Sequence, residues 1–314
     1  MGITIILTGK HDPTSDYIQK AFALKKKNIS KVCIDRNYFP KINLNPIKKQ
    51  GWIEDINQKK IQLKNISSVI VRRPQSPIKE NSKATNRFYN REILHGLRSV
   101  LESIDATWMN HPNSNEAASS KPKNLRLATE IGLKVPATLI SSDPILLTNW
   151  LNKNKYCVMK SISYGLMQDK NDSKMAFTQR IPANFNINEN IVNGVPILLQ
   201  KEIKKSYDIR VTVVGDKIFS ASLPSNDNVD WRTYDNKSKW KRFELPKNIS
   251  DSCLKMCKKL NLNFAAIDLV IDKENHFFFL EINPNGQWVW IEKETGLPIS
   301  KAIVNVLTEE QDGY

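Results

Sequence analysis

Cysteine and histidine are scarce in this chain, and neither residue type is grouped. Four cysteines and four histidines are spread over 314 residues, and no two cysteines form a C-x-x-C pair. This scatter argues against a zinc site, whose ligands usually come in closely spaced pairs. We expect core thiols of a reducing compartment. They are Cys33, Cys157, Cys253 and Cys257.

Long apolar runs are also missing. No stretch approaches the roughly 20 consecutive apolar residues that a membrane-spanning helix needs. The first ten residues are apolar, but they lack a basic region and a small-residue cleavage site. We therefore expect a first strand rather than a signal peptide, no membrane partner, and a cytoplasmic location.

Negative charge is in deficit. Lysine and arginine number 47 against 32 aspartates and glutamates, which gives a formal net charge of +15. Such an excess is typical of proteins that bind nucleic acid. Here the basic residues are spread along the chain, and no zinc finger, RNA-recognition motif or basic zipper accompanies them, so we predict no nucleic-acid partner. An acidic peptide substrate, ATP or simple solubility explains the charge equally well.

The order of the predicted elements indicates an α/β fold. Up to residue 112, apolar strands alternate with segments of helical periodicity, which is typical of a parallel sheet with helices on its faces. The strands are expected at residues 3–7, 31–34 and 68–71, and the helices at residues 16–24 and 87–104.

Beyond residue 112 the pattern changes to hairpins and separate helices, which indicates an α+β arrangement. We expect helices at residues 121–132, 144–151, 249–260 and 299–307, and strands at residues 136–140, 156–160, 197–203, 208–214 and 217–223. Asp143 followed by Pro144 predicts a helix N-terminus, and residues 168–175 are expected to form a polar turn. Three domains are predicted, covering residues 1–112, 113–195 and 196–314.

The most informative stretch is a predicted hairpin near the C-terminus, with strands at residues 264–271 and 277–283. Asp268 interrupts the first strand. Glu281 and Asn283 lie two residues apart on the second and share a face. A polar rim is the simpler interpretation, but an unpaired buried carboxylate is costly. Three hard oxygen ligands suit Mg²⁺, which takes its other ligands from water and nucleotide phosphates. The hairpin therefore predicts a magnesium site.

Two lysines are candidates for phosphate binding. Lys160 ends a strand just before the small-residue loop at residues 161–165, where loop amides could cover phosphate oxygens. Lys121 opens a helix and could serve the same phosphates. The alternative for both is a solvated surface charge.

Further candidates follow the strand that starts at residue 197. It ends in Gln200, Lys201, Glu202 and Ile203. Their backbone could meet an adenine edge, and Asp208 could meet ribose hydroxyls. Asp208 and Arg210 share a strand face, so they form either a salt bridge or a site with Arg210 facing phosphate. Arg232 is a second candidate, because the planar arginine fork suits phosphate and carboxylate groups.

Taken in order, these residues resemble the ATP-grasp superfamily and, more narrowly, the microviridin-type graspetide synthetases, which are ATP-grasp macrocyclases of ribosomal peptides. The specific motifs are Arg72-Arg73-Pro74, the leucine- and proline-spaced pattern of residues 124–144, Asp230-Trp231-Arg232, and residues 283–292, where Asn-Pro-Asn continues as Gly-Gln-Trp. The loop after Lys160 departs from the family pattern, since it holds one glycine, Gly165.

The resemblance implies an ATP-grasp fold with an N-terminal α/β domain, a central domain with a phosphate-covering loop where a leader peptide could dock, and a C-terminal domain for nucleotide and metal. It implies ATP and Mg²⁺ as cofactors, and Asp268, Glu281 and Asn283 as the metal ligands. Further roles follow for the remaining candidates: Lys121 and Lys160 at the phosphates, Glu202 and Ile203 at adenine, Asp208 at the ribose or the nucleophile, and Arg210 and Arg232 at the transferring phosphate or substrate carboxylate.

The implied activity is ATP-dependent macrocyclisation of a precursor peptide with a leader and an acidic core, through ω-ester or ω-amide bonds, by a homodimeric enzyme. One alternative is an ATP-grasp ligase that adds a free amino acid to a peptide or protein. The other is a nucleotide- or peptide-binding module without catalysis.

Overall fold

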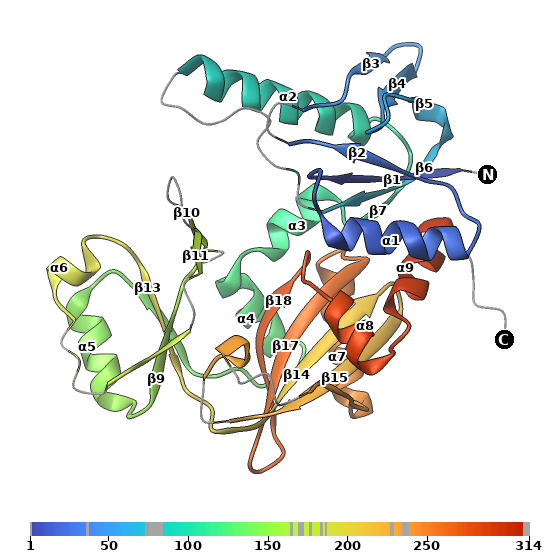
Figure 1. The fold of residues 1–314 in the computed structure, drawn as a ribbon. Helices are drawn as coiled ribbons and strands as arrows, with labels where there is room; N and C mark the ends of the chain where they lie inside the picture. Colours follow the sequence, from blue (N-terminus) through green and yellow to red (C-terminus); the bar gives the residue numbers. More distant parts are fainter. Residues whose placement is uncertain are drawn as a thin grey trace.

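The computed structural model describes residues 2–35, 38–72, 74, 84–163, 166–168, 173–175, 178–182, 185, 187–226, 229–233 and 239–309. Three bodies of secondary structure follow one another along the chain: an N-terminal α/β layer, a central antiparallel sheet and a C-terminal antiparallel sheet (Figure 1). Within these ranges no helix has the length and apolar character to cross a bilayer.

The N-terminal sheet is parallel, as predicted, and its strand order is β2-β1-β6-β7. Its strands are β1 (Ile3–Thr8), β2 (Ile29–Cys33), β6 (Ile66–Val71) and β7 (Thr107–Met109). Helix α1 (Pro13–Leu24) covers one face and α2 (Ala84–Glu102) the other (Figure 1). The apolar run of β1 is buried on both sides, because Ile6 shares a core with α1 while Ile5 and Leu7 share one with α2.

A three-stranded meander between β2 and β6 was not expected from the sequence. It consists of β3 (Ile42–Asn45), β4 (Gln50–Glu54) and β5 (Lys60–Gln62), followed by the short helix η1 (Leu63–Asn65). Its strands are three to five residues long, so any alternation along them gives little signal. Burial of Ile53, Ile61 and Leu63 against the N-terminal core holds it in place.

The central sheet has the order β12-β9-β13-β8 and is antiparallel. Its strands are β8 (Thr138–Ser141), β9 (Cys157–Lys160), β12 (Gln179–Ile181) and β13 (Ile197–Lys201), and helices α5 (Pro144–Lys153) and α6 (Glu189–Val192) accompany it. The helices α3 (Pro112–Ala118) and α4 (Lys121–Glu130) lead into it. The domain boundary expected after residue 195 stays a prediction. Strand β13 lies beyond that position and pairs with β8 and β9 of the central sheet.

The expectation of a polar turn at residues 168–175 was wrong at both ends. Strands β10 (Leu166–Gln168) and β11 (Ser173–Met175) pair with each other, so Gln168 and Ser173 belong to a two-stranded sheet. Strands of three residues have no periodicity long enough to be recognised.

The C-terminal sheet is antiparallel in the order β16-β15-β14-β17-β18. Its strands are β14 (Lys205–Val214), β15 (Lys217–Pro224), β16 (Lys241–Arg242), β17 (Phe264–Asp272) and β18 (Phe277–Asn283). The helices of this part are η2 (Trp231–Thr233), α7 (Lys247–Lys259), α8 (Val289–Thr295) and α9 (Ile299–Thr308).

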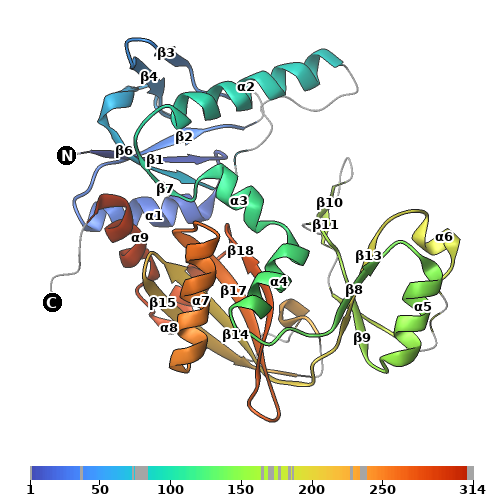
Figure 2. The ribbon, with the colours of Figure 1, turned by 180° about the vertical axis from the view of Figure 1, so that it is seen from behind.

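Strand β14 shows how this sheet positions a polar site. Ile209, Val211 and Val213 pack in the core that α4 and α7 cover (Figure 2). Because side chains alternate along a strand, Asp208 and Arg210 point to the opposite face. They are buried there as polar residues. The apolar alternation of one strand thus fixes both the core and the polar face.

Candidate active site

All twelve residues that the sequence predicted for the site line one cavity of about 1130 Å³. They come from the central sheet and the segment that follows β13, from the C-terminal sheet, from η2 and from the start of α4. They are Lys121, Lys160, Gln200, Lys201, Glu202, Ile203, Asp208, Arg210, Arg232, Asp268, Glu281 and Asn283. The structure therefore brings together residues that are up to 162 positions apart, between residues 121 and 283.

The three predicted metal ligands lie together on the β17–β18 hairpin. Asp268 is the direct cross-strand partner of Glu281, and Asn283 pairs with Ala266, two positions further along. Burial raises the pKa of the Asp268 carboxyl, and the nearby Glu281 raises it further, while Arg210 opposes the shift. Three clustered hard oxygen donors fit Mg²⁺, whose charge would relieve the repulsion between the carboxylates of Asp268 and Glu281.

Arg210 is held firmly, and its partner is not Asp208. Its Nη1 donates to Asp268 Oδ1 at 2.6 Å across the β14–β17 pair, and its Nη2 donates to the main-chain carbonyl of Gln287 at 2.9 Å. The side chain is 7% exposed. The salt bridge between Asp208 and Arg210 that the sequence left open is therefore wrong for this structure. Asp208 pairs instead with Lys205, at 2.7 Å.

Both lysines point into the cavity. Lys121 Nζ donates to the carbonyl of Ser161 at 2.6 Å and lies 3.9 Å from Glu281 Oε2. Lys160 Nζ donates to Gln200 Oε1 at 2.8 Å, and burial lowers the pKa of this ammonium below its ordinary value. Two cations in a partly enclosed space suit an anionic ligand such as a phosphate group. Tyr164 and Gly165 of the predicted phosphate-covering loop lie outside the described residues.

The segment expected to meet adenine already uses two of its amides. The Lys201 amide donates to the carbonyl of Ala137, and the Glu202 amide donates to the carbonyl of Tyr156. The Glu202 carboxylate accepts a two-pronged contact from Arg180 of β12, with Nη2 at 2.7 Å. An adenine edge would thus have to meet other groups of this segment. Arg180 also lines the cavity, and no sequence signal near it pointed to that role.

Arg232 lies on η2 and is oriented by Asp230, which the sequence analysis named as part of the Asp230-Trp231-Arg232 motif without giving it a role of its own. Its Nε donates to Asp230 Oδ1 at 2.8 Å, and its Nη2 donates to Oδ2 at 2.5 Å. Burial alone would raise the pKa of Asp230, but the hydrogen bonds and charge of Arg232 lower it below the ordinary value. The ring of Trp231 is edge-on to that of Trp240, with centroids 5.4 Å apart, and tilted against that of Trp290, with centroids 5.1 Å apart. This cluster fixes the turn that carries Arg232.

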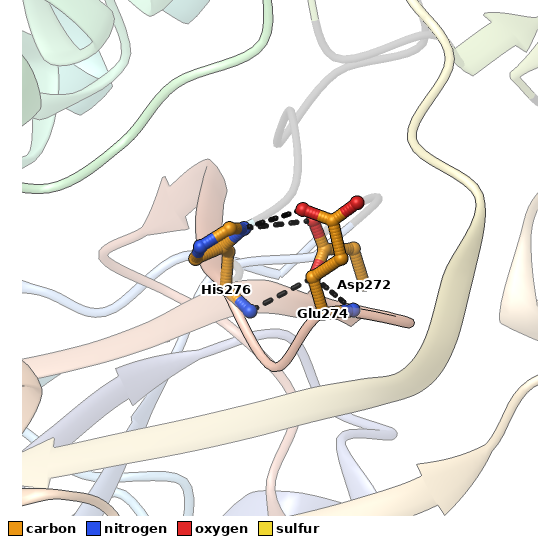
Figure 3. A group of neighbouring side chains, drawn as sticks. All are labelled: Asp272, Glu274 and His276. Carbon is orange, nitrogen blue, oxygen red and sulfur yellow. Dashed lines mark hydrogen bonds and ion pairs between the residues drawn. The ribbon is translucent and has the colours of Figure 1, made fainter.

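A second group of potential metal ligands lies at the turn of the same hairpin (Figure 3). Asp272, Glu274 and His276 place their ligand atoms within 4.8 Å of one another. Asp272 Oδ1 accepts the backbone amides of Glu274 and His276. Desolvation alone would raise the pKa of Asp272, but these bonds and the contact with the His276 side chain lower it below its ordinary value. The interactions of Asp272 therefore close the turn.

Comparison with known proteins places this geometry in a family. A model of the RimK-like ATP-grasp domain matches residues 118–307. Among curated proteins, an uncharacterized protein of Mycoplasma genitalium, MG012, is 36% identical over 93 residues. That match covers 29% of this chain and 32% of MG012, so the chain spans about a third of the length of this relative.

Solved structures resemble the chain over nearly its whole length. The macrocyclase MdnC of Microcystis aeruginosa, solved with its precursor peptide MdnA, is 25% identical with a TM-score of 0.82, over 98% of this chain and 100% of that chain. A RiPP-associated ATP-grasp ligase of Chryseobacterium gregarium, solved with ADP and a leader and core peptide, is 24% identical with a TM-score of 0.88, over 99% of this chain and 98% of that chain. The second likeness shows the shared fold.

Proposed function

Because this chain belongs to the RimK-like ATP-grasp family, we propose that it is an ATP-dependent macrocyclase of a ribosomally made precursor peptide. The observation that carries the proposal is the likeness to MdnC, which extends over 98% of this chain and so beyond the family-matched residues 118–307. The cavity supports the same reaction class, because it brings Lys121, Lys160, Arg210 and Arg232 together with three clustered oxygen donors.

The proposed reaction has two steps. The γ-phosphoryl group of ATP is transferred to an Asp or Glu side chain of the peptide, which yields ADP and an acyl phosphate. A Thr or Ser hydroxyl, or a Lys amine, then attacks the carbonyl carbon, and phosphate leaves as the ω-ester or ω-amide forms. The nucleophile gives up its proton, so each ring removes one water from the peptide. A net charge of +15 favours binding of a carboxylate-rich core.

The four cationic candidates are proposed to act on different groups in this reaction. Lys121 and Lys160 are placed to bind ATP phosphates. Arg210 and Arg232 are placed to bind the transferring phosphoryl group or the substrate carboxylate, where preorganised donors stabilise developing charge. Asp268, Glu281 and Asn283 would hold Mg²⁺, which neutralises phosphate charge when bound.

Gln200, Lys201, Glu202 and Ile203 form the wall proposed for adenine. Asp208 lies beside that wall. Its pairing with Lys205 favours a contact to ribose over a role as a base for the incoming nucleophile, because an ion-paired carboxylate is a weaker proton acceptor.

The direct test is to incubate the purified protein with ATP, Mg²⁺ and a short acidic peptide, rich in Thr or Lys, encoded beside its gene. We expect mass spectrometry to show the loss of one water per ring, and only when ATP is present. ATP consumption that requires a free amino acid would instead identify the amino-acid ligase. ATP binding without ADP release on any peptide would identify the non-catalytic module.

Two variants test the proposed roles. Arg210→Ala is expected to abolish ring formation while peptide binding persists, and Glu281→Ala is expected to lose Mg²⁺-dependent ATP turnover. Arg126→Ala and Glu130→Ala are matched controls, because these residues form an exposed pair on α4. Wild-type turnover in Arg210→Ala would remove that residue from the mechanism. Full activity in Glu281→Ala would do the same for the metal hairpin.

The cytoplasmic location, the homodimer and the absence of a nucleic-acid partner stay predictions. Light scattering of the purified protein, with and without peptide, tests the homodimer. Cell fractionation tests the location. Binding of a random DNA or RNA duplex by the purified protein, measured at physiological salt, tests the absence of a nucleic-acid partner.

A further inference from the structure

Arg72 is the one member of the Arg72-Arg73-Pro74 motif whose side-chain contacts the structure describes, and it lies outside the main cavity. Its amide donates to the carbonyl of Leu7 at 2.9 Å, so the residue continues the pairing of β6 with β1. Its side chain is 4% exposed. A buried guanidinium is costly without polar partners, so the partners it has here indicate its role.

The first partner is the Asp12 carboxylate, 3.6 Å from Arg72 Nε. Asp12 is itself fixed, because its Oδ2 accepts from the Thr8 hydroxyl at 3.0 Å and its Oδ1 caps α1 by accepting the Thr14 amide at 3.1 Å. This arrangement leaves Arg72 little freedom to turn, because its anion is bound to the end of β1 and the start of α1.

The second partner is Gln287, which belongs to the Asn-Pro-Asn-Gly-Gln-Trp motif of the C-terminal domain. Gln287 Oε1 accepts from Arg72 Nη2 at 3.4 Å and from the Thr14 hydroxyl at 3.0 Å. Its main-chain carbonyl accepts from Arg210 Nη2 at 2.9 Å. One residue therefore joins the N-terminal layer to Arg210.

The loop around Gln287 is packed tightly against β17 and Arg210. A Cβ atom on Gly286 would lie 2.3 Å from the Cβ of Ala266 and 3.2 Å from Arg210 Nη2. Gln287 also contributes to the walls of both the main cavity and a neighbouring cavity of about 520 Å³ beside α1. A shift of this loop would move the carbonyl that holds Arg210.

We propose that Arg72 is a positioning residue: with Thr14 it fixes the side chain of Gln287, so that the Gln287 carbonyl orients the guanidinium of Arg210 in the cavity. The N-terminal layer thereby sets the geometry of a residue that acts in another domain. The consequence for turnover rests on the role proposed above for Arg210, whereas the anchoring of the loop does not.

The test uses three variants of the full-length protein. Arg72→Lys keeps the charge but loses the fork, Thr14→Val removes one hydroxyl at nearly constant volume, and Thr14→Ser keeps that hydroxyl. The first readout is hydrogen–deuterium exchange of the amides at residues 283–290, with Mg²⁺ and ADP as the only additions. We expect at least tenfold faster exchange in Arg72→Lys and Thr14→Val, and near-normal exchange in Thr14→Ser. Arg98→Lys is the control, since Arg98 pairs with Glu102 on the exposed face of α2.

The second readout is turnover with the peptide that the wild-type protein modifies. We expect kcat to fall at least tenfold in Arg72→Lys with KM for ATP within twofold, and Arg72→Lys combined with Thr14→Val to be little worse than Arg72→Lys alone. Three outcomes are distinguished.

Unchanged hydrogen exchange at residues 283–290 in Arg72→Lys would overturn the proposal, even if no peptide is modified. Faster exchange with an unchanged kcat would overturn the link between this loop and Arg210. Failure of the wild-type protein to modify any peptide would count against the proposed function alone.

Discussion

At the scale of single residues, Asp230 matters because it meets Arg232 through both carboxylate oxygens. The pKa of Asp230 lies below its ordinary value, so the folded state favours the carboxylate. The stability from this pair is present above the ordinary pKa of aspartate and is lost as the pH falls through the lowered value. Asp230→Asn should cost about 2 kcal/mol at pH 7, typical of hydrogen bonds to a charged group.

Urea unfolding of wild type and Asp230→Asn at pH 7, 4 and 3 measures this difference. We expect the two proteins to converge as the pH falls. Asp251→Asn is the control, because the Asp251 pair with Lys247 is solvent-exposed and should contribute less than about 1 kcal/mol. A difference that stays constant down to pH 3 would show that ionisation of Asp230 is not its source.

The pKa values of Cys253 and Cys257 are raised, in contrast to the lowered pKa of Asp230. Both are buried on α7, and burial raises the pKa of each to about 12. The folded state therefore favours the thiols, and the stability that this gives is present below the unfolded-state pKa and is lost as the pH rises toward 12.

We expect these two cysteines to react with iodoacetamide at pH 8 at least about 100-fold more slowly than free cysteine, because the thiolate is the nucleophile. Peptide mapping after timed alkylation measures both rates, and unfolding in guanidinium should equalise them. Fast labelling of Cys253 in the folded protein would contradict the burial of its side chain beneath α7.

At the scale of elements, the hairpin of β17 and β18 was predictable because its signal is local. Two apolar runs flank a polar turn, and the residues that interrupt them, Asp268 and Glu281, turn out to be direct cross-strand partners. The alternation on β14 likewise predicted that Asp208 and Arg210 share a face. Local periodicity thus located five of the twelve candidate residues, namely Asp208, Arg210, Asp268, Glu281 and Asn283.

The contacts that could not be predicted are those between elements distant in sequence. Arg180 of β12 pairs with Glu202, which follows β13, across the strand β9 that lies between them in the sheet. No sequence feature near residue 180 signals this ion pair. Arg210 pairs with Asp268 rather than Asp208 because of the register between β14 and β17. Helix α8 was missed because seven residues give no clear helical period, although Gly296 ends it with φ of +67°.

The start of α5 tests an element-level prediction. Asp143 was expected to cap this helix, and its Oδ1 accepts the amides of Ile145 and Leu146 at 2.8 and 3.1 Å. Asp143→Ala should lower the free energy of unfolding by about 1 kcal/mol, and Asp143→Asn by much less, because asparagine caps nearly as well. Chemical denaturation of the three proteins decides this, and equal losses in both variants would indicate a role for the charge rather than the cap.

At the scale of the whole molecule, two kinds of contact join the N-terminal layer to the C-terminal sheet. One is apolar: α9 packs beside α1, as both views show (Figures 1 and 2), and it shares a core with Ile6 and Ile70 of the parallel sheet. The other is polar, and includes the hydrogen bonds of Gln287, Asn110, Asn263 and Tyr17. Apolar packing gives affinity but little register, whereas buried hydrogen bonds require one alignment. The relative placement of the two layers should therefore depend on these few polar residues.

Asn110 is the residue at which this dependence can be measured. It follows β7 and is 1% exposed. Its Nδ2 donates to the carbonyls of Phe264 and Pro284 at 2.8 and 3.0 Å, and its Oδ1 accepts the Phe264 amide at 2.8 Å. Asn110→Ala would leave these backbone groups buried without their partner, which should cost about 3 kcal/mol.

Urea unfolding followed by tryptophan fluorescence measures this loss. Asn263→Ala is the matched control, because Asn263 makes one comparable bond to the carbonyl of Trp108 from an exposed position, and it should cost less than about 1 kcal/mol. If the polar contacts set the alignment of the layers, Asn110→Ala should also increase hydrogen exchange at residues 283–290, the loop that holds Arg210. A loss of stability without that increase would mean that α9 alone maintains the alignment.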